Sequence, residues 1–174
     1  MQTKARHRGF TLLEVLIAML IFSIGLLGMA GLLIVSVKAN HSAYLRTQAS
    51  FLAQSMADRM RGNMPKVWTG DYDGDYPSGD ADPCTGGGAC SRANIATRDK
   101  AIWSTQITDQ LPSGAATIAC VPTAGVDVSA EDQENGAPYA GICTMVMTWS
   151  ESNLDRSTTD TAPVLQRFAW VFQP

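Results

Sequence analysis

Histidine is nearly absent from this chain, which has only His7 and His41 among its 174 residues. Ser-His-Asp and Cys-His catalytic groups need an imidazole as their general base, so these mechanisms have almost no material here. The four cysteines include no C-x-x-C pair, which leaves zinc binding and redox catalysis without support. We therefore expect no enzymatic activity and no firm cofactor.

Charge is also scarce in residues 9–37, because Glu14 is the only charged residue between Arg8 and Lys38. A carboxylate in an apolar segment costs about 2.5 to 3.5 kcal/mol at a helix centre and less near the interface, which makes Glu14 a candidate functional residue. The apolar segment, residues 10–37, would reach about 42 Å as a helix. A hydrocarbon core is roughly 30 Å thick, so this segment is predicted to cross a membrane once.

Basic residues precede the apolar segment at Lys4, Arg6 and Arg8, and the positive-inside rule places them in the cytoplasm. Everything after Lys38 would then lie outside the cytoplasm. No A-x-A-like cleavage site follows the apolar segment, and the residues instead suggest cleavage before it, at Gly9. The net charge of −3 gives no general reason to bind nucleic acid.

The basic leader, Gly9, Phe10 and Glu14 together resemble the precursors of the type IV pilins and their relatives. The resemblance implies that a prepilin peptidase removes a leader of residues 1–9, that Phe10 is N-methylated, and that Glu14 pairs with the terminal amine of a subunit. Such a pair offsets part of the cost of burying each charge and can set the register of packed helices. The proline that commonly breaks the membrane helix of major pilins is absent.

By this resemblance the chain would be a minor pilin, a structural subunit that enters a type IV pilus or primes its assembly. The implied partners are the prepilin peptidase, the major pilin, other minor pilins and the inner-membrane assembly platform. Before assembly it would be a single-pass inner-membrane protein with a periplasmic C-terminal domain, and afterwards part of a pilus at the cell surface. A minor pseudopilin of a type II secretion system, a calcium-dependent adhesin and a DNA-uptake pilin remain alternatives.

The rest of the sequence predicts an α+β, type IV pilin-like fold, in which a long N-terminal helix packs on a small antiparallel sheet. Residues 38–64 continue the membrane helix into the periplasm until Gly62 and Pro65 stop it. One face of this helix carries an apolar stripe at helical spacing. The stripe consists of Leu45, Ala49, Leu52, Met56 and Met60.

Residues 65–174 form the predicted globular domain. Apolar spacing from Ile95 to Leu111 indicates a second helix. Strands are expected at 116–121, 142–149 and 164–172, where apolar runs or alternation occur, and antiparallel pairing because the connections show little sign of crossover helices.

Residues 68–89 have the composition of an acidic loop. Four carboxylates there occupy positions one, three, five and twelve of an EF-hand-like frame, which suggests oxygen ligands for Ca²⁺. They are Asp71, Asp73, Asp75 and Asp82. The frame has Tyr76 where a glycine is needed and an aspartate where a glutamate is usual, so a solvated acidic loop is the alternative.

All four cysteines follow the membrane segment, as expected for disulfides formed outside the cytoplasm. Four cysteines permit three pairings. We favour Cys84 with Cys90, which closes a small Gly-rich loop, and Cys120 with Cys143, which joins two adjacent strands.

Overall fold

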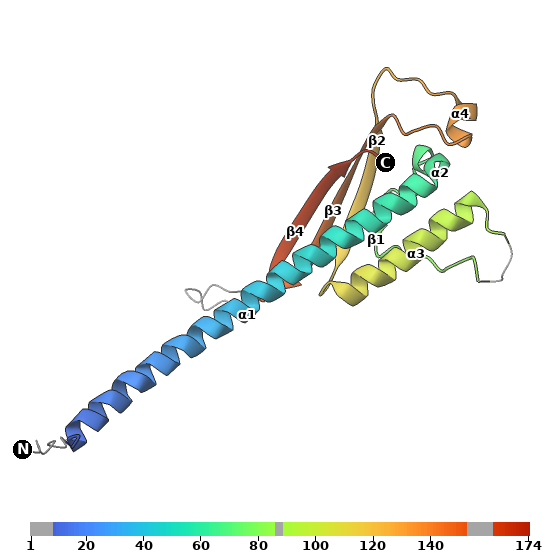
Figure 1. Cartoon of the computed structure of the whole chain (residues 1–174). Helices are drawn as coiled ribbons and strands as arrows, with labels where there is room; N and C mark the ends of the chain where they lie inside the picture. Colours follow the sequence, from blue (N-terminus) through green and yellow to red (C-terminus); the bar gives the residue numbers. More distant parts are fainter. Residues whose placement is uncertain (1–8, 86–88, 153–161) are drawn as a thin grey trace, which may run out of the picture. The chain divides into compact units, whose positions relative to one another are not determined.

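The computed structural model describes residues 9–85, 89–152 and 162–174 of the chain (Figure 1). The basic residues Lys4, Arg6 and Arg8, on which the predicted leader partly depends, lie outside the described residues. The chain divides into two compact units between His41 and Ser42. Each unit is described by itself.

The described part of the first unit is mainly helical and belongs to α1 (Leu12–Gly62). Thr11 begins this helix, because its hydroxyl oxygen accepts a hydrogen bond from the Glu14 backbone N–H at 3.3 Å. A threonine followed three residues later by a glutamate is a helix-start pattern, and a carboxylate in the first turn favours the positive end of the helix dipole. Gly25, Gly28 and Gly31 lie within the helix, which continues through them without a break.

In the second unit, the latter part of α1 contributes the predicted apolar stripe to the core. All five residues of the stripe are buried, which confirms this prediction. The helix ends at Gly62, and the short helix α2 (Met64–Trp68) follows with Pro65 near its start. Proline is tolerated in the first turn of a helix but not in its interior. Pro65 therefore prevents α1 from continuing and fits the first turn of α2.

The predicted second helix is α3 (Arg92–Gln110), which begins where the Ser91 hydroxyl accepts a hydrogen bond from the Asn94 N–H. Trp103 is fully buried and its indole N–H donates to the Leu52 carbonyl oxygen of α1 at 2.9 Å. Ile95, expected on the buried face, is exposed, and Ala96 is buried in its place. The apolar face of α3 therefore begins one residue later than predicted.

The sheet contains four antiparallel strands in the order β1-β2-β3-β4. The bounds are β1 (Gly74–Tyr76), β2 (Ala115–Pro122), β3 (Gly141–Glu151) and β4 (Val164–Phe172). Alternate residues of β3, from Cys143 to Trp149, are buried against the helices. The three predicted strands and their antiparallel pairing are thus confirmed, and α1 packs on the small sheet in the α+β, type IV pilin-like arrangement (Figure 1).

Three short elements, α2, β1 and α4, were not predicted. Strand β1 lies inside the segment expected to be an acidic loop, where its backbone pairs with β2 from Gly74 to Tyr76. Helix α4 (Ala130–Glu134) lies in the polar segment between β2 and β3 and is capped by the Ser129 hydroxyl. Segments of three to five residues are too short to show periodicity, so pattern alone cannot find them.

Candidate functional site

Phe10 and Glu14, the residues of the predicted assembly site, are four residues apart in the chain at the beginning of α1. Phe10 precedes the helix and its side chain is 84% exposed, and Glu14 is exposed one turn further along the chain. A shallow hollow of about 580 Å³ runs along this face and is lined mainly by apolar side chains. The lining residues are Phe10, Glu14, Val15, Ala18, Met19 and Phe22.

In the described part of the first unit, no other residues pack over the apolar segment of α1. Every large apolar residue from Phe10 to Val37 is exposed. Among the described residues, α1 is the helix that is long and apolar enough to cross a membrane. A helix that exposes apolar side chains all round needs lipid or other helices around it, so the segment is built for a membrane or a helix bundle.

A charged group at Glu14 is compatible with that setting only if it is compensated. The Glu14 backbone N–H donates to Thr11 at the start of α1. Within the described part of the chain, no hydrogen bond to the Glu14 carboxylate occurs. Pairing with a cation from another chain would offset part of the cost of burying the carboxylate. The predicted roles of Gly9 in cleavage, Phe10 in methylation and Glu14 in pairing stay predictions.

The carboxylates of the calcium-binding frame do not converge among the described residues, and calcium binding there stays a prediction. Asp71 forms an ion pair with Lys66 at 2.9 Å, and Asp75 accepts a hydrogen bond from the Thr117 hydroxyl at 2.9 Å across β1 and β2. Asp73 accepts from the Cys120 backbone N–H at 3.2 Å. Asp82 accepts from the Cys84 backbone N–H at 2.8 Å.

Each of these four carboxylates thus has a partner that the other three do not share. In the described ranges, no group of three or more His, Cys, Asp or Glu side chains is arranged to hold a metal ion. Burial raises the pKa of Asp73, and the hydrogen bond from Cys120 partly opposes that shift. Strand β1 forms within the frame and extends the backbone that a calcium loop would curl.

The structure joins the cysteines in the pairs that the sequence favoured. Cys84 bonds to Cys90, and Cys120 bonds to Cys143 across paired positions of β2 and β3. All four lie in the second unit. Their chemistry is structural, because no cysteine in the chain is free to act as a nucleophile.

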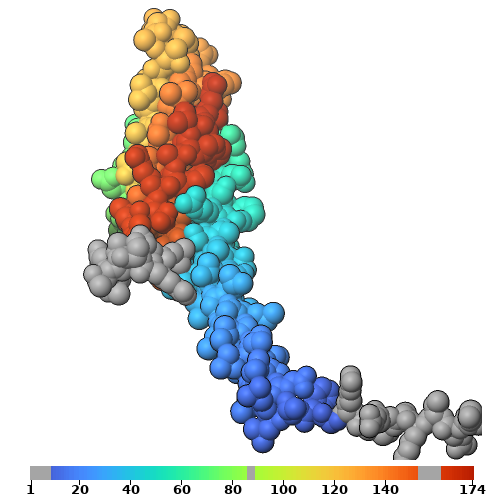
Figure 2. Space-filling model, turned by 90° about the vertical axis from the view of Figure 1, so that its left-hand side faces the viewer, coloured from blue at the N-terminus to red at the C-terminus, as the bar shows by residue number. Residues whose placement is uncertain are grey.

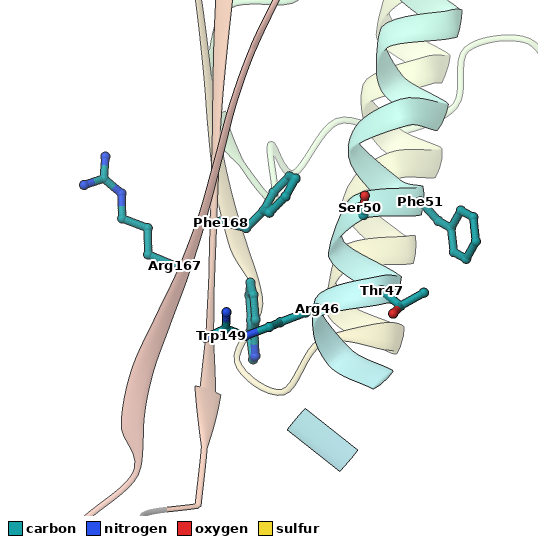
Figure 3. Close-up of a pocket in the computed structure, with 7 residues that line it drawn as sticks. All are labelled: Arg46, Thr47, Ser50, Phe51, Trp149, Arg167 and Phe168. Atoms are coloured by element: carbon teal, nitrogen blue, oxygen red, sulfur yellow. The ribbon is translucent and has the colours of Figure 1, made fainter. Parts of the chain in front are cut away.

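A groove of about 410 Å³ lies between α1 and the strands β3 and β4 (Figure 3). Trp149 and Phe168 point from the sheet toward α1, whereas Arg167 points to the other side of the sheet. Arg46 reaches from the helix to the Gln166 side-chain oxygen at 3.2 Å. The lining holds no His, Cys, Asp or Glu, so this groove offers no general acid or base near neutral pH.

A buried polar network in the second unit was missed by sequence reasoning. The Asp99 carboxylate accepts from the Arg59 guanidinium and from the Tyr72 hydroxyl, both at 2.9 Å. The Asn63 amide donates to the Tyr72 hydroxyl and to the Arg92 carbonyl oxygen. The available signal was Asp99 itself, a charge spaced between Ala96 and Trp103 on the core face of α3.

A family model described as the prokaryotic N-terminal methylation motif matches residues 4–30. No curated protein and no solved structure matches the chain. The matched segment covers the predicted cleavage site, Phe10, Glu14 and most of the apolar segment 10–37. The family model does not extend to the disulfide-bonded domain.

The motif and the exposed apolar helix support a type IV pilin-like subunit of a pilus or pseudopilus. The motif indicates a structural subunit and not an enzyme, and it implies processing by a prepilin peptidase and assembly with other pilins in a membrane. The apolar helix fits a membrane-anchored pilin. The particular system and the kind of subunit are matters of proposal.

Proposed function

We propose that the chain is a minor pilin, cleaved after Gly9 and incorporated into a type IV pilus or used to prime its assembly. The observation that carries this proposal is the combination of the methylation motif over residues 4–30 with an apolar helix whose large side chains are exposed in the described part of the chain. Such a helix reaches a stable state by packing with other subunits after it leaves the lipid.

The choice of a pilus rests on a sequence resemblance. Residues 23–28 and 54–63 resemble the minor pilin called PilV, or type IV pilus modification protein. In this proposal the single-pass helix holds the chain in the inner membrane, and the disulfide-bonded domain lies in the periplasm. The major pilin, the other minor pilins and the assembly platform are its partners there.

A minor pseudopilin of a type II secretion system is the second candidate, because the same N-terminal motif supports a pseudopilus equally well. Comparing purified pili from strains that lack either the pilus or the secretion assembly platform separates the two. The proposed function predicts that the chain is found in sheared pili and disappears from them only when the pilus platform is missing. Dependence on the secretion platform alone would favour the pseudopilin.

The roles proposed for Gly9 and Glu14 are tested by a matched pair of variants. Gly9→Ala is expected to block cleavage, because the family's peptidase cuts after glycine. Glu14→Val is expected to spare cleavage and to lower the amount of the chain in purified pili at least tenfold, since the buried amine loses its counter-charge. Cleaved Glu14→Val protein in pili at the wild-type level would remove Glu14 from the assembly mechanism.

A further inference from the structure

Exposed apolar side chains of the second unit gather on the outer face of the sheet, opposite the helices. Leu165 of β4 is 66% exposed and Val171 is 57% exposed. Val121 of β2 and Ile142 of β3 are also exposed and are register partners. Apolar residues that cluster on the surface of a folded domain mark interaction sites more often than isolated ones do.

The free edge of β4 adjoins this face. Strand β4 is nine residues long, pairs with β3 on one side, and stands at the end of the strand order. No backbone hydrogen bond from the rest of the described chain reaches its other side. Figure 2 shows red atoms of the C-terminal part, which contains β4, at the surface that faces the viewer. An open strand edge presents a row of backbone donors and acceptors that another strand can pair with.

One charge interrupts the outer row of β4. Leu165, Arg167, Ala169 and Val171 alternate with inward residues and therefore share the outer face. Arg167 points away from α1 in Figure 3, and no carboxylate of the described residues forms an ion pair with it. A strand bound at this edge would place one of its own side chains opposite the unpaired guanidinium.

Pairing of β4 with a second copy of itself is disfavoured by charge. Strands that pair about their centres would bring the Arg167 side chains of both copies close together on the outer face. Like charges at neighbouring positions of paired strands destabilise the pairing.

We propose that the free edge of β4 binds an extended strand of a different protein, apolar on its outer face and with a carboxylate facing Arg167. Backbone hydrogen bonds to β4 supply the contact, and the apolar row with one cation selects the partner strand. This inference goes beyond the proposed function, since it concerns a surface of the second unit and needs neither cleavage nor methylation.

The test uses the full-length protein in detergent and two synthetic nine-residue peptides of alternating threonine and valine. One peptide carries glutamate at its central position and the other carries lysine there. Hydrogen exchange of β4 is expected to slow with the glutamate peptide, and the lysine peptide is expected to bind at least tenfold more weakly. In Arg167→Glu protein the preference should reverse.

Arg92→Glu is the matched control, because it makes the same charge change at an exposed arginine on α3. It should leave the peptide preference unchanged. Equal binding of both peptides, protection outside β4, or dimers that form through β4 without peptide would each overturn the proposal. The N-terminus of Arg167→Glu protein is expected to match that of the wild type, so failure at β4 would leave the proposed function untouched.

Discussion

At the scale of single residues, Asp99 is a buried carboxylate that joins separate parts of the second unit through hydrogen bonds. It is 7% exposed, and its two carboxylate oxygens are held by Arg59 of α1 and by Tyr72 of the segment before β1. Asn63, at the end of α1, donates to the same tyrosine hydroxyl. These hydrogen bonds connect the end of α1, the start of α3 and the segment before β1.

Removing the carboxylate should therefore cost more than removing the tyrosine hydroxyl. Asp99→Ala is expected to lower the free energy of unfolding by about 2 to 3 kcal/mol, because a half-buried donor on Arg59 and a buried donor on Tyr72 lose their acceptor. Tyr72→Phe should cost about 1 kcal/mol, since Arg59 still pairs with Asp99. Urea unfolding followed by tryptophan fluorescence measures both.

Asp58→Ala is the surface control, because Asp58 forms an exposed pair with Arg61 and should cost less than about 0.5 kcal/mol. A loss for Asp99→Ala no larger than this control would contradict the role given to the network.

The same tyrosine makes stability fall in alkaline solution. Burial raises the pKa of Tyr72 well above its usual value, the hydrogen bond from Asn63 opposes the shift, and the Asp99 carboxylate adds to it. In the unfolded chain a tyrosine ionises near pH 10, so above about pH 10 the unfolded state binds fewer protons than the folded state. The free energy of unfolding should decrease as pH rises from about 10, and less steeply in Tyr72→Phe protein. Equal slopes of the free energy of unfolding against pH for the two proteins, between about pH 9 and about pH 11.5, would contradict this account.

At the scale of elements, two glycines are expected to respond in opposite ways to alanine. A Cβ at Gly141, the first residue of β3, would meet the Val121 carbonyl oxygen and lie 2.7 Å from Pro122 Cα, both in β2. Backbone atoms there cannot move without disturbing the β2–β3 pairing, so Gly141→Ala should lower the free energy of unfolding by about 1 to 3 kcal/mol.

Gly62, the last residue of α1, has open space around it and no positive φ. Gly62→Ala should therefore be neutral or stabilising by up to about 1 kcal/mol. Urea titration of the two variants side by side checks the contrast, and a stabilising Gly141→Ala would show that the strand pairing tolerates the methyl group.

Elements with enough length to show a period were predictable from the sequence. The stripe from Leu45 to Met60 repeats over four turns, and β3 alternates over eleven residues, so burial follows the pattern in both. Strand β1 could not be found, because its three residues have loop composition and pair only through contacts distant in the sequence. Tertiary pairing decided the structure there.

The candidate site divides in a similar way. Gly9, Phe10 and Glu14 could be selected as candidates because composition, order and spacing coincide within a few residues, and their roles stay predictions. The network around Asp99 was not found, because its members come from positions 59, 63, 72 and 99 and meet only in the folded domain. Residue types alone do not show which of several acidic residues will be buried.

At the scale of the whole molecule, the two units differ in what stabilises them. The buried hydrophobic core lies within residues 45–172, and both disulfides belong to the same unit. Residues 10–37 contribute no buried side chain. The second unit thus has its own core, and the first depends on lipid or on other chains.

A chain restricted to Ser42–Pro174 and exported to the periplasm should therefore fold by itself. We expect a cooperative urea transition, a near-ultraviolet circular dichroism signal from the buried tryptophans, and no thiol available for alkylation. Dye binding to exposed apolar surface with no near-ultraviolet signal would show that the unit needs the preceding helix.

The central claim is that the chain is a processed pilin-like subunit, and its N-terminus tests this claim most directly. Intact-mass and terminal-peptide mass spectrometry of the membrane-extracted protein should be carried out in cells with and without the prepilin peptidase. The account predicts an N-methylated Phe10 terminus that appears only when the peptidase is present. Retention of Met1 in both strains would contradict it and would make the apolar helix an ordinary membrane anchor.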